Sequence, residues 1–372
     1  MKRWLANLSA VAASAGLSLL LTEGALRLAR VHYPAFYTVN AERGYGLRAG
    51  AEGRWTREGN GQVRVNSAGF RGPEFKLAPP ANGLRVAVLG DSFTEALQVD
   101  EQATWIQQLQ VRLNKDPRCP LLSGHSAGAQ LLNFGVGGYG TGQELLTWRH
   151  LASRYEPALV ILAFYLGNDI TDNDPKQRKD RPVFRLGRGG QLSIDQSFRE
   201  QPATRWRLSP PGQLVESAFN HSRLLQLLNE AKNRLAAQRT SPSAMPPAGP
   251  PVTTEDSDEA WATTDALIGQ LNQEVRAQGA RLLVVSTSSP EQVWPRPDQR
   301  PAQPFAREQR LAGLLTSRRI PYLALGPLLQ RHADQQGLTL HGFSGQAPGE
   351  GHWNTEGHRL AAAAIAPWLC RQ

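Results

Sequence analysis

The sequence predicts an α/β fold in which a parallel β-sheet is covered by helices on both faces. Apolar runs of strand length recur along the chain, and segments with helical periodicity separate them. Strands that alternate with helices are typical of a parallel sheet, because each parallel connection needs a crossover. Forty per cent of the 372 residues are apolar, which supplies a real core and excludes a wholly disordered chain.

The N-terminal segment has the pattern of a membrane anchor. Lys2 and Arg3 precede residues 4–22, an uncharged run that ends at Glu23. A helix of that length reaches about 28 Å, close to the thickness of a bilayer's hydrocarbon core. We interpret residues 1–30 as an uncleaved signal anchor in the inner membrane, with the rest of the chain on the periplasmic side. The alternative is secretion after cleavage near residues 13–15, where small residues resemble a signal-peptidase site.

Residues 31–80 form a small lead-in, predicted to be β-rich or irregular, and residues 81–372 form the main domain. The elements of the main domain follow from its pattern of apolar residues. Strands are predicted at residues 84–89, 131–134, 158–164, 282–286 and 321–325, and helices at residues 105–113, 214–235, 261–278 and 355–369.

An insertion interrupts this pattern at about residues 172–255. Its first part is charged and rich in Pro and Gly, without a clear period. Residues 241–251 are Pro-rich and predict a linker or loop.

Residue types suited to catalysis follow the predicted strands. In a parallel sheet, active residues lie just past the carboxyl ends of the strands. A Ser on a tight turn there exposes its hydroxyl and has an amide free to donate, and repeated glycines let backbone amides approach a ligand. Four such segments stand in order: Gly90-Asp91-Ser92, the glycine-rich residues 135–140, Gly167-Asn168-Asp169, and Glu350-Gly351-His352.

These four segments in this order resemble the conserved blocks of the SGNH/GDSL hydrolase superfamily. The resemblance covers about residues 84–370, apart from the insertion, and residues 65–72 also resemble the lead-in of bacterial membrane-anchored members. It implies a three-layer α/β/α sandwich with a flavodoxin-like parallel sheet. It also implies acyl transfer through a serine nucleophile, without a cofactor or metal.

The resemblance implies a role for each matching residue. Ser92 would be the nucleophile and His352 the base that takes its proton. The oxyanion hole would combine the amides of Ser92 and Gly138 with the side chain of Asn168. The two carboxylates next to these blocks, Asp91 and Asp169, are expected to brace their turns.

The acid that orients the histidine departs from the family pattern. Most members place an Asp two or three residues before the His, whereas this chain has Gly349 and Glu350. Glu350 could accept a hydrogen bond from the imidazole, which would make a Ser-His-Glu triad. The alternative is a Ser-His dyad in which Glu350 is a solvated loop residue.

Other motifs give weaker signals. Ser126 lies in a G-x-S-x-G sequence, but the segment before it is a poor strand, so we interpret it as a surface loop rather than the nucleophile of an intracellular lipase. His352 and His358 with Glu356 lack the spacing of metal ligands. The only cysteines, Cys119 and Cys370, would both lie at the end of the sheet opposite the catalytic residues, and whether they form a disulfide stays open.

Charge and composition exclude some partners. The net charge is +9, but the 41 Lys and Arg residues are scattered and match no nucleic-acid motif, so no nucleic acid is expected. We predict an esterase that acts on O-acyl, most naturally O-acetyl, esters of a cell-envelope glycan or another envelope ester. An O-acetyltransferase of an exopolysaccharide or peptidoglycan could use the same residues, and a non-catalytic glycan-binding protein could keep the fold. Protein partners cannot be read from a single sequence.

Overall fold

The computed structural model of the protein describes residues 2–174, 180–239, 257–345 and 348–372. Its centre is a five-stranded sheet of order β11-β10-β7-β5-β6 in which every neighbouring pair is parallel. The strands are β5 (Leu84–Gly90), β6 (Ala129–Asn133), β7 (Leu159–Tyr165), β10 (Arg281–Thr287) and β11 (Tyr322–Ala324). If these five strands are numbered 1 to 5 in the order of the chain, their order across the sheet, starting at the edge strand β6, is 2-1-3-4-5. This is the flavodoxin-like strand order.

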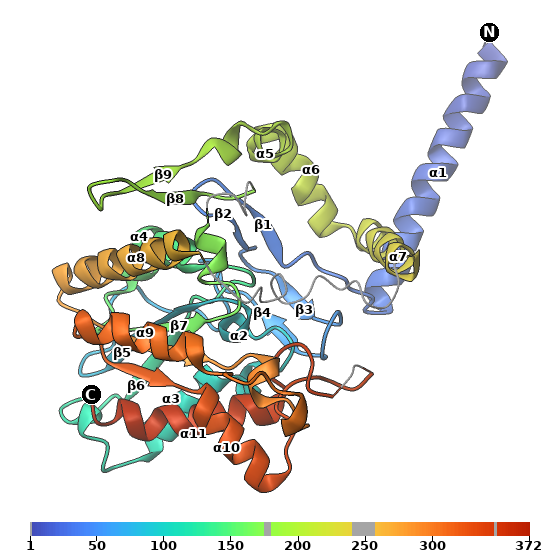
Figure 1. Ribbon diagram of the computed structural model, residues 1–372. Helices are drawn as coiled ribbons and strands as arrows, with labels where there is room; N and C mark the ends of the chain where they lie inside the picture. Colours follow the sequence, from blue (N-terminus) through green and yellow to red (C-terminus); the bar gives the residue numbers. More distant parts are fainter. Residues whose placement is uncertain (1, 175–179, 240–256, 346–347) are drawn as a thin grey trace.

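Helices cover both faces of this sheet (Figure 1). One face packs against α4 (Thr141–His150), α8 (Asp258–Ala277) and α9 (Ala306–Ser317). The other packs against α3 (Trp105–Lys115), α10 (Gly326–Gln336) and α11 (Thr355–Leu369). Along β5, Val86 and Val88 enter one core, and Ala87 and Leu89 enter the other, because successive side chains of a strand point to opposite faces. The predicted three-layer α/β/α fold is confirmed.

Some predicted elements differ from those observed. The single helix expected over residues 214–235 is two helices, α6 (Pro210–His221) and α7 (Arg223–Arg239). They separate at Ser222, because the carboxylate of Glu23 accepts hydrogen bonds from the amides that begin α7. Helix α4 was not predicted, since it is buried almost all round and has no apolar stripe.

The lead-in of residues 31–80 packs against the main domain at the carboxyl end of β5. It contains two antiparallel pairs, β1 (Tyr37–Asn40) with β2 (Gly44–Leu47) and β3 (Glu52–Arg54) with β4 (Gln62–Arg64). Its small core includes Leu97, which belongs to the turn that follows β5. Arg71, also buried, donates hydrogen bonds to the carbonyls of Glu95, Ala96 and Val99 in that same turn.

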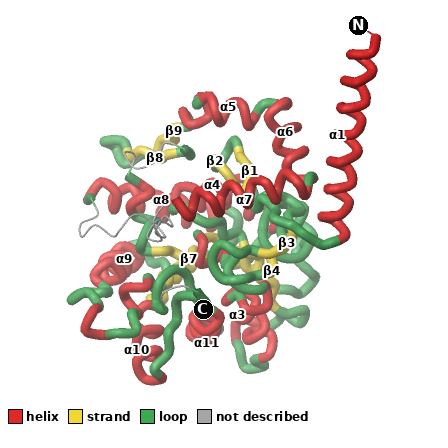
Figure 2. The backbone as a smooth tube through the Cα atoms, turned by 90° about the vertical axis from the view of Figure 1, so that its right-hand side faces the viewer, coloured by secondary structure: helices red, strands yellow, loops and turns green. Residues whose placement is uncertain are grey.

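The described residues of the insertion contribute a hairpin and three α-helices. The hairpin pairs β8 (Val183–Leu186) with β9 (Leu192–Asp195), and α5 (Pro202–Leu208) precedes α6 and α7. We call α5, α6 and α7 the helical arm. The predicted Pro-rich linker at residues 241–251 lies outside the described residues. The N-terminal helix α1 (Lys2–Leu28) stands clear of the main domain, with its base beside α7 (Figures 1 and 2).

The remaining helical segments are short. They are α2 (Ser92–Glu95) and the 3-10 turns η1 (Glu101–Ala103), η2 (Pro120–Leu122), η3 (Ala152–Tyr155), η4 (Thr171–Asn173), η5 (Ser197–Glu200), η6 (Pro290–Val293) and η7 (Pro297–Gln299).

Cys119 and Cys370 form a disulfide that spans 251 positions, with 5.0 Å between their Cα atoms. It ties the loop after α3 to the end of α11. Replacing both cysteines with Ser is expected to lower the free energy of unfolding by about 2–5 kcal/mol, because the bridge restricts the unfolded chain. Denaturant unfolding of the double variant measures this. An unchanged midpoint would show that the packing of α3 on α11 alone holds this corner.

Candidate active site

Ser92 lies at the carboxyl end of β5, beside the point where the strand order reverses between β5 and β7. Asp91 caps the short helix α2, and its carboxylate accepts a hydrogen bond of 2.9 Å from the amide of Phe93. The turn requires Gly90, because a Cβ there would lie 2.3 Å from the hydroxyl of Thr94. These constraints place the Ser92 side chain at the first position of the helix, partly open to solvent.

His352 precedes α11 and contacts Ser92 directly. Its Nε2 lies 2.8 Å from Ser92 Oγ. On the other side of the ring, Nδ1 lies 2.5 Å from Oε2 of Glu58, and the His352 amide donates to Glu58 Oε1 at 2.7 Å. Because a carboxylate can only accept at Nδ1, that nitrogen carries the proton, and Nε2 is left to accept from the serine hydroxyl. The structure therefore contains a hydrogen-bonded chain from carboxylate to imidazole to hydroxyl.

The carboxylate at the imidazole is Glu58 rather than Glu350, which corrects the assignment made from the sequence. Glu350 is exposed, and Gly351 stands between it and the histidine with φ +73°. A Cβ at Gly351 would lie 2.2 Å from Glu58 Oε1, so the buried Glu58 carboxylate occupies the space against this turn. Glu58 is 294 positions from His352 in the sequence. The only sequence signal for another acid was that Gly349 stands where most members of the superfamily that the sequence resembles have an Asp.

The loop between β3 and β4 presents Glu58 because it is pressed against the backbone that follows α2. A Cβ at Gly59 would lie 2.3 Å from the carbonyl oxygen of Gln98, and one at Gly61 would lie 2.4 Å from that of Leu97. The amide of Asn60 donates to the same Gln98 carbonyl at 3.1 Å. Glycine is therefore needed on both sides of Asn60 for the loop to sit close enough for Glu58 to reach the imidazole.

Burial and the Glu58–His352 contact act against each other on both pKa values. Burial raises the pKa of Glu58, but its hydrogen bonds with His352 and the charge of the ring outweigh this, so the pKa falls below its usual value. Burial lowers the pKa of His352, but the hydrogen bond and charge of Glu58 outweigh that, and the pKa is raised above 6.5. The carboxylate therefore favours the imidazolium that forms when the ring takes a proton.

The glycine-rich loop after β6 is held by its carbonyl groups. Three consecutive carbonyls accept hydrogen bonds: Gly137 from the Tyr45 hydroxyl at 2.8 Å, Gly138 from Arg181 Nη1 at 2.5 Å, and Tyr139 from Asn168 Nδ2 at 2.8 Å. In a trans peptide the next amide points opposite to the carbonyl, so the Gly138 amide is directed away from Tyr45. The loop is thereby preorganised, with side chains of the lead-in and the insertion fixing its peptide planes.

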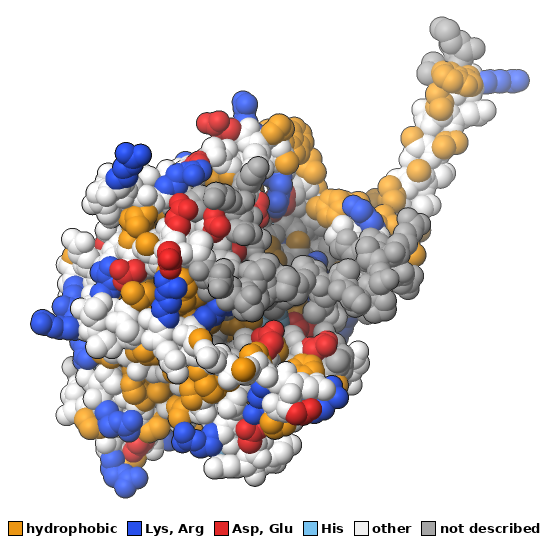
Figure 3. All heavy atoms as spheres, in the orientation of Figure 1, with side chains coloured by type: hydrophobic (Ala, Val, Ile, Leu, Met, Phe, Trp, Pro, Cys, Tyr) orange, Lys and Arg blue, Asp and Glu red, His pale blue; other side chains and the backbone are white. Residues whose placement is uncertain are grey.

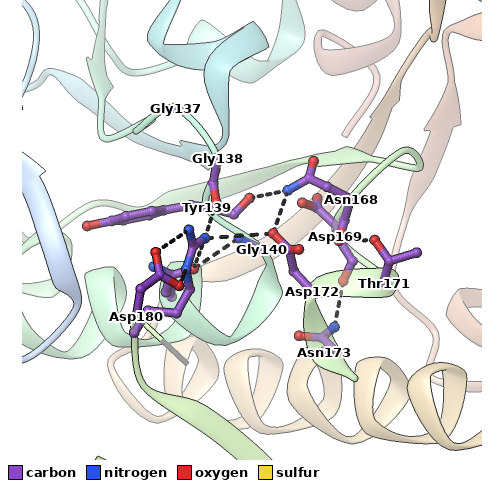
Figure 4. Close-up of polar contacts among 12 residues, drawn as sticks. Gly137, Gly138, Tyr139, Gly140, Asn168, Asp169, Thr171, Asp172, Asn173 and Asp180 are labelled. Carbon is purple, nitrogen blue, oxygen red and sulfur yellow. Dashed lines mark hydrogen bonds and ion pairs between the residues drawn. The ribbon is translucent and has the colours of Figure 1, made fainter. Parts of the chain in front are cut away.

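Asn168 follows β7 and lies between the glycine loop and Asp172 (Figure 4). Its side-chain nitrogen donates to the carbonyl of Tyr139 and, at 3.2 Å, to Asp172 Oδ2. Both N–H groups of the amide are thus directed at protein acceptors. Asn168 braces the loop as the structure stands, and it would have to release its longer bond to Asp172 to donate to an oxyanion.

Buried acids lie beneath the site. Asp169 is fully buried, and its Oδ2 accepts from the amide of Tyr165 at 2.7 Å, so it braces the turn after β7. Burial raises the pKa of Asp91 to about 7. Burial likewise raises the pKa values of Asp169 and Glu144, and the charges of Glu144 on Asp169 and of Asp91 on Glu144 raise them further. Burial and these charges therefore favour the neutral form of both carboxyl groups.

The remaining sequence candidates lie apart from this chain of hydrogen bonds. Ser126 lies in the loop before β6, whereas Ser92 follows the parallel strand β5, so the two serines are at opposite ends of the sheet. His358 is buried, which lowers its pKa to about 3, and its Nδ1 lies 3.3 Å from the Trp105 amide. Trp353 is also buried and donates to Ser288 Oγ at 2.9 Å. Within the described ranges, no group of His, Cys, Asp or Glu is arranged to hold a metal ion.

No protein-family model matches the chain, and no curated protein matches it. Solved structures do. The acetyl xylan esterase AlAXEase aligns with a TM-score of 0.42 and 11% identity, over 77% of this chain and all (100%) of that one. TesA aligns with a TM-score of 0.39 and 14% identity, over 77% of this chain and 97% of TesA. A GDSL-like lipase from Bacteroides thetaiotaomicron aligns with a TM-score of 0.34 and 13% identity, over 77% and 87%. Likenesses this distant carry no argument about the reaction, which therefore rests on the geometry of the site.

Proposed function

We propose that this chain is a serine esterase of the SGNH/GDSL type that cleaves O-acyl esters through an acyl-enzyme on Ser92. One observation carries the proposal, namely the hydrogen-bonded chain from Glu58 through His352 to Ser92 at the carboxyl end of the sheet. A nucleophile, a base within reach of its proton and an acid that orients the base are the parts that acyl transfer needs.

In the first half-reaction the Ser92 oxygen attacks the ester carbonyl while its proton passes to Nε2 of His352. Glu58 stabilises the imidazolium through Nδ1. The carbonyl oxygen becomes an oxyanion, for which the amides of Ser92 and Gly138 are the proposed donors, with Asn168 as a third. The bond to the leaving alcohol then breaks, and His352 returns the proton to the alcohol oxygen.

In the second half-reaction water replaces the alcohol. His352, neutral again, takes a proton from a water molecule that attacks the acyl carbonyl, and the same donors hold the second oxyanion. Collapse of this intermediate breaks the bond to Ser92, whose oxygen regains the proton from His352. The products are the free carboxylic acid and the unmodified enzyme. A sugar hydroxyl in place of water would make the same residues an acyltransferase.

We further propose that α1 anchors the enzyme and that its substrate is an O-acetylated envelope glycan. Among the residues that the structure describes, one helix, with a candidate span at Asn7–Leu28, is long and apolar enough to cross a membrane, and none of it is buried within the protein. The disulfide between Cys119 and Cys370 supports a location outside the reducing cytoplasm.

The proposal is tested by treating the wild-type protein with a fluorophosphonate probe and mapping the modified residue by mass spectrometry. We expect modification at Ser92 alone and release of acetate from an O-acetylated polysaccharide. Acetate moved onto an added sugar acceptor, with little free acid, would identify a transferase. A folded protein that resists the probe and binds the glycan without cleaving it would overturn the enzyme assignment.

Asn168→Ala is expected to lower kcat for an aryl acetate by on the order of 10²-fold, because the variant loses both a candidate oxyanion donor and the brace on the Tyr139 carbonyl. Steady-state kinetics measures this. Asp172→Asn serves as the comparison, since it keeps an acceptor oxygen for Asn168 while it removes the charge that pairs with Arg181 at 3.7 Å. If Asn168→Ala keeps the wild-type kcat, Asn168 has no part in stabilising the oxyanion.

A further inference from the structure

Exposed apolar side chains gather on the helical arm. Outside α1, most of the large apolar residues that are exposed in the described part of the chain lie there: Trp206, Leu214, Val215, Phe219, Leu228 and Leu235. Leu214 is 72% exposed, more than any other of these. Figure 3 shows hydrophobic side chains over α5 and along α6, on the side towards α1. A grouped apolar surface of this kind marks a region that contacts something other than water.

Helix α6 has its polar side turned inward and its apolar side turned outward. On the inner side, Glu216 accepts a hydrogen bond of 2.5 Å from the hydroxyl of Thr38 in the lead-in. On the outer side, Leu214 and Val215 are exposed. Phe219, also exposed, lies at the edge of this side, where it borders a cavity lined by Tyr33 and Tyr37 of the lead-in. A helix on a water-soluble domain is normally oriented the other way. This orientation is the one expected of a helix that lies in a membrane interface.

The arm is joined firmly to α1. Glu23 of α1 accepts hydrogen bonds from the Ser222 hydroxyl at 3.1 Å and from the amides of Arg223 and Leu224 at 2.9 and 3.1 Å. Arg27 donates to the carbonyl of His221 at 2.6 Å. Glu23 is also the residue at which the uncharged run of α1 ends. The junction of α6 and α7 is therefore held at the level where the uncharged run of α1 ends.

We propose that the outer face of the arm, formed by Trp206, Leu214, Val215 and Phe219, is embedded in the surface of the same bilayer that α1 crosses. The inference rests on the membrane anchoring in the proposed function. Trp206 stands between Arg205, which is exposed, and Arg207, which pairs with Glu216 at 3.7 Å, and a Trp beside an exposed cation suits the level of anionic lipid headgroups.

The geometry of α1 allows this arrangement. In Figure 1, α1 leans away from α6, so a bilayer that lies along α6 must be crossed by α1 at a slant. The uncharged run at residues 4–22 is about 28 Å long, close to the ~30 Å hydrocarbon core, and transmembrane helices are tilted by about 20° on average. Since the arm packs on the lead-in that carries Glu58, such docking would also fix the orientation of the catalytic end relative to the membrane.

The test uses the full-length protein reconstituted in vesicles of phosphatidylcholine and phosphatidylglycerol. Single Cys variants Leu214→Cys, Leu20→Cys and Leu328→Cys are labelled with an environment-sensitive nitrobenzoxadiazole probe, while the native cysteines stay paired in their disulfide. Leu20 lies in α1, and Leu328 is an exposed leucine on α10, away from the arm. We expect blue-shifted emission and quenching by spin-labelled lipids at positions 214 and 20, and neither effect at position 328.

The experiment distinguishes the membrane anchoring of α1 from the docking of the arm, because different results would overturn each. Quenching at position 20 without quenching at 214 would overturn the docking of the arm and leave the anchor intact. Absence of quenching at position 20 would overturn the anchor itself. A blue shift at 214 that spin-labelled lipid does not quench would mean that a protein, such as a second copy of the chain, covers this face, and would also overturn the proposal.

Discussion

Ser92→Ala is expected to abolish labelling by a fluorophosphonate and to lower kcat for a short-chain aryl acetate by on the order of 10⁴–10⁶-fold. The variant lacks the oxygen that forms the acyl-enzyme, and the base has no proton to take. The fold should be unaffected, because His352 keeps its hydrogen bonds to Glu58. Active-site labelling and steady-state kinetics measure the effect, with circular dichroism as the check on folding.

Ser126→Ala is the matched control for this experiment. Ser126 is an exposed serine in a G-x-S-x-G sequence at the opposite end of the sheet, and its loss should leave labelling and turnover at the wild-type level. If turnover survives in Ser92→Ala and disappears in Ser126→Ala, the assignment of the active site is wrong.

Glu58→Gln is expected to lower kcat by on the order of 10²–10⁴-fold while leaving KM nearly unchanged. A neutral amide cannot stabilise the imidazolium, and it can present an N–H that leaves His352 in the wrong tautomer. The pH profile gives a second readout. Because Glu58 holds the pKa of His352 above 6.5, and catalysis needs the neutral ring, wild-type activity rises with pH through that raised pKa. Without the carboxylate, the acid limb of kcat/KM should move to lower pH.

Glu350→Gln separates this assignment from the one suggested by the sequence. Both variants exchange a glutamate for its isosteric amide close to His352, but only Glu58 contacts the ring. We expect Glu350→Gln to keep the wild-type kcat and pH profile. Loss of activity in Glu350→Gln together with a normal Glu58→Gln would restore Glu350 as the orienting acid.

The sequence by itself determined the class of fold and two members of the hydrogen-bonded chain, Ser92 and His352. Buried parallel strands are continuous apolar runs, so residues 84–89, 158–164 and 282–286 could be recognised without any knowledge of their neighbours. Ser92 and His352 could be proposed because each belongs to a short local motif just past a strand or before a helix. The structure brings these two residues within hydrogen-bonding distance.

Only the tertiary structure decided which residues complete the site. Glu58 is brought to His352 by a glycine-flanked loop of the lead-in, and the glycine loop is held by Tyr45 and Arg181 from two segments outside the family-like core. Which side of α6 faces outward could be seen only in the structure, where Glu216 on the other side accepts a hydrogen bond from Thr38 of the lead-in. A short stretch of sequence indicates which backbone conformation its residues prefer and which of its side chains are buried. A hydrogen bond between residues 294 positions apart depends on how separate elements pack, and no short stretch of sequence contains that information.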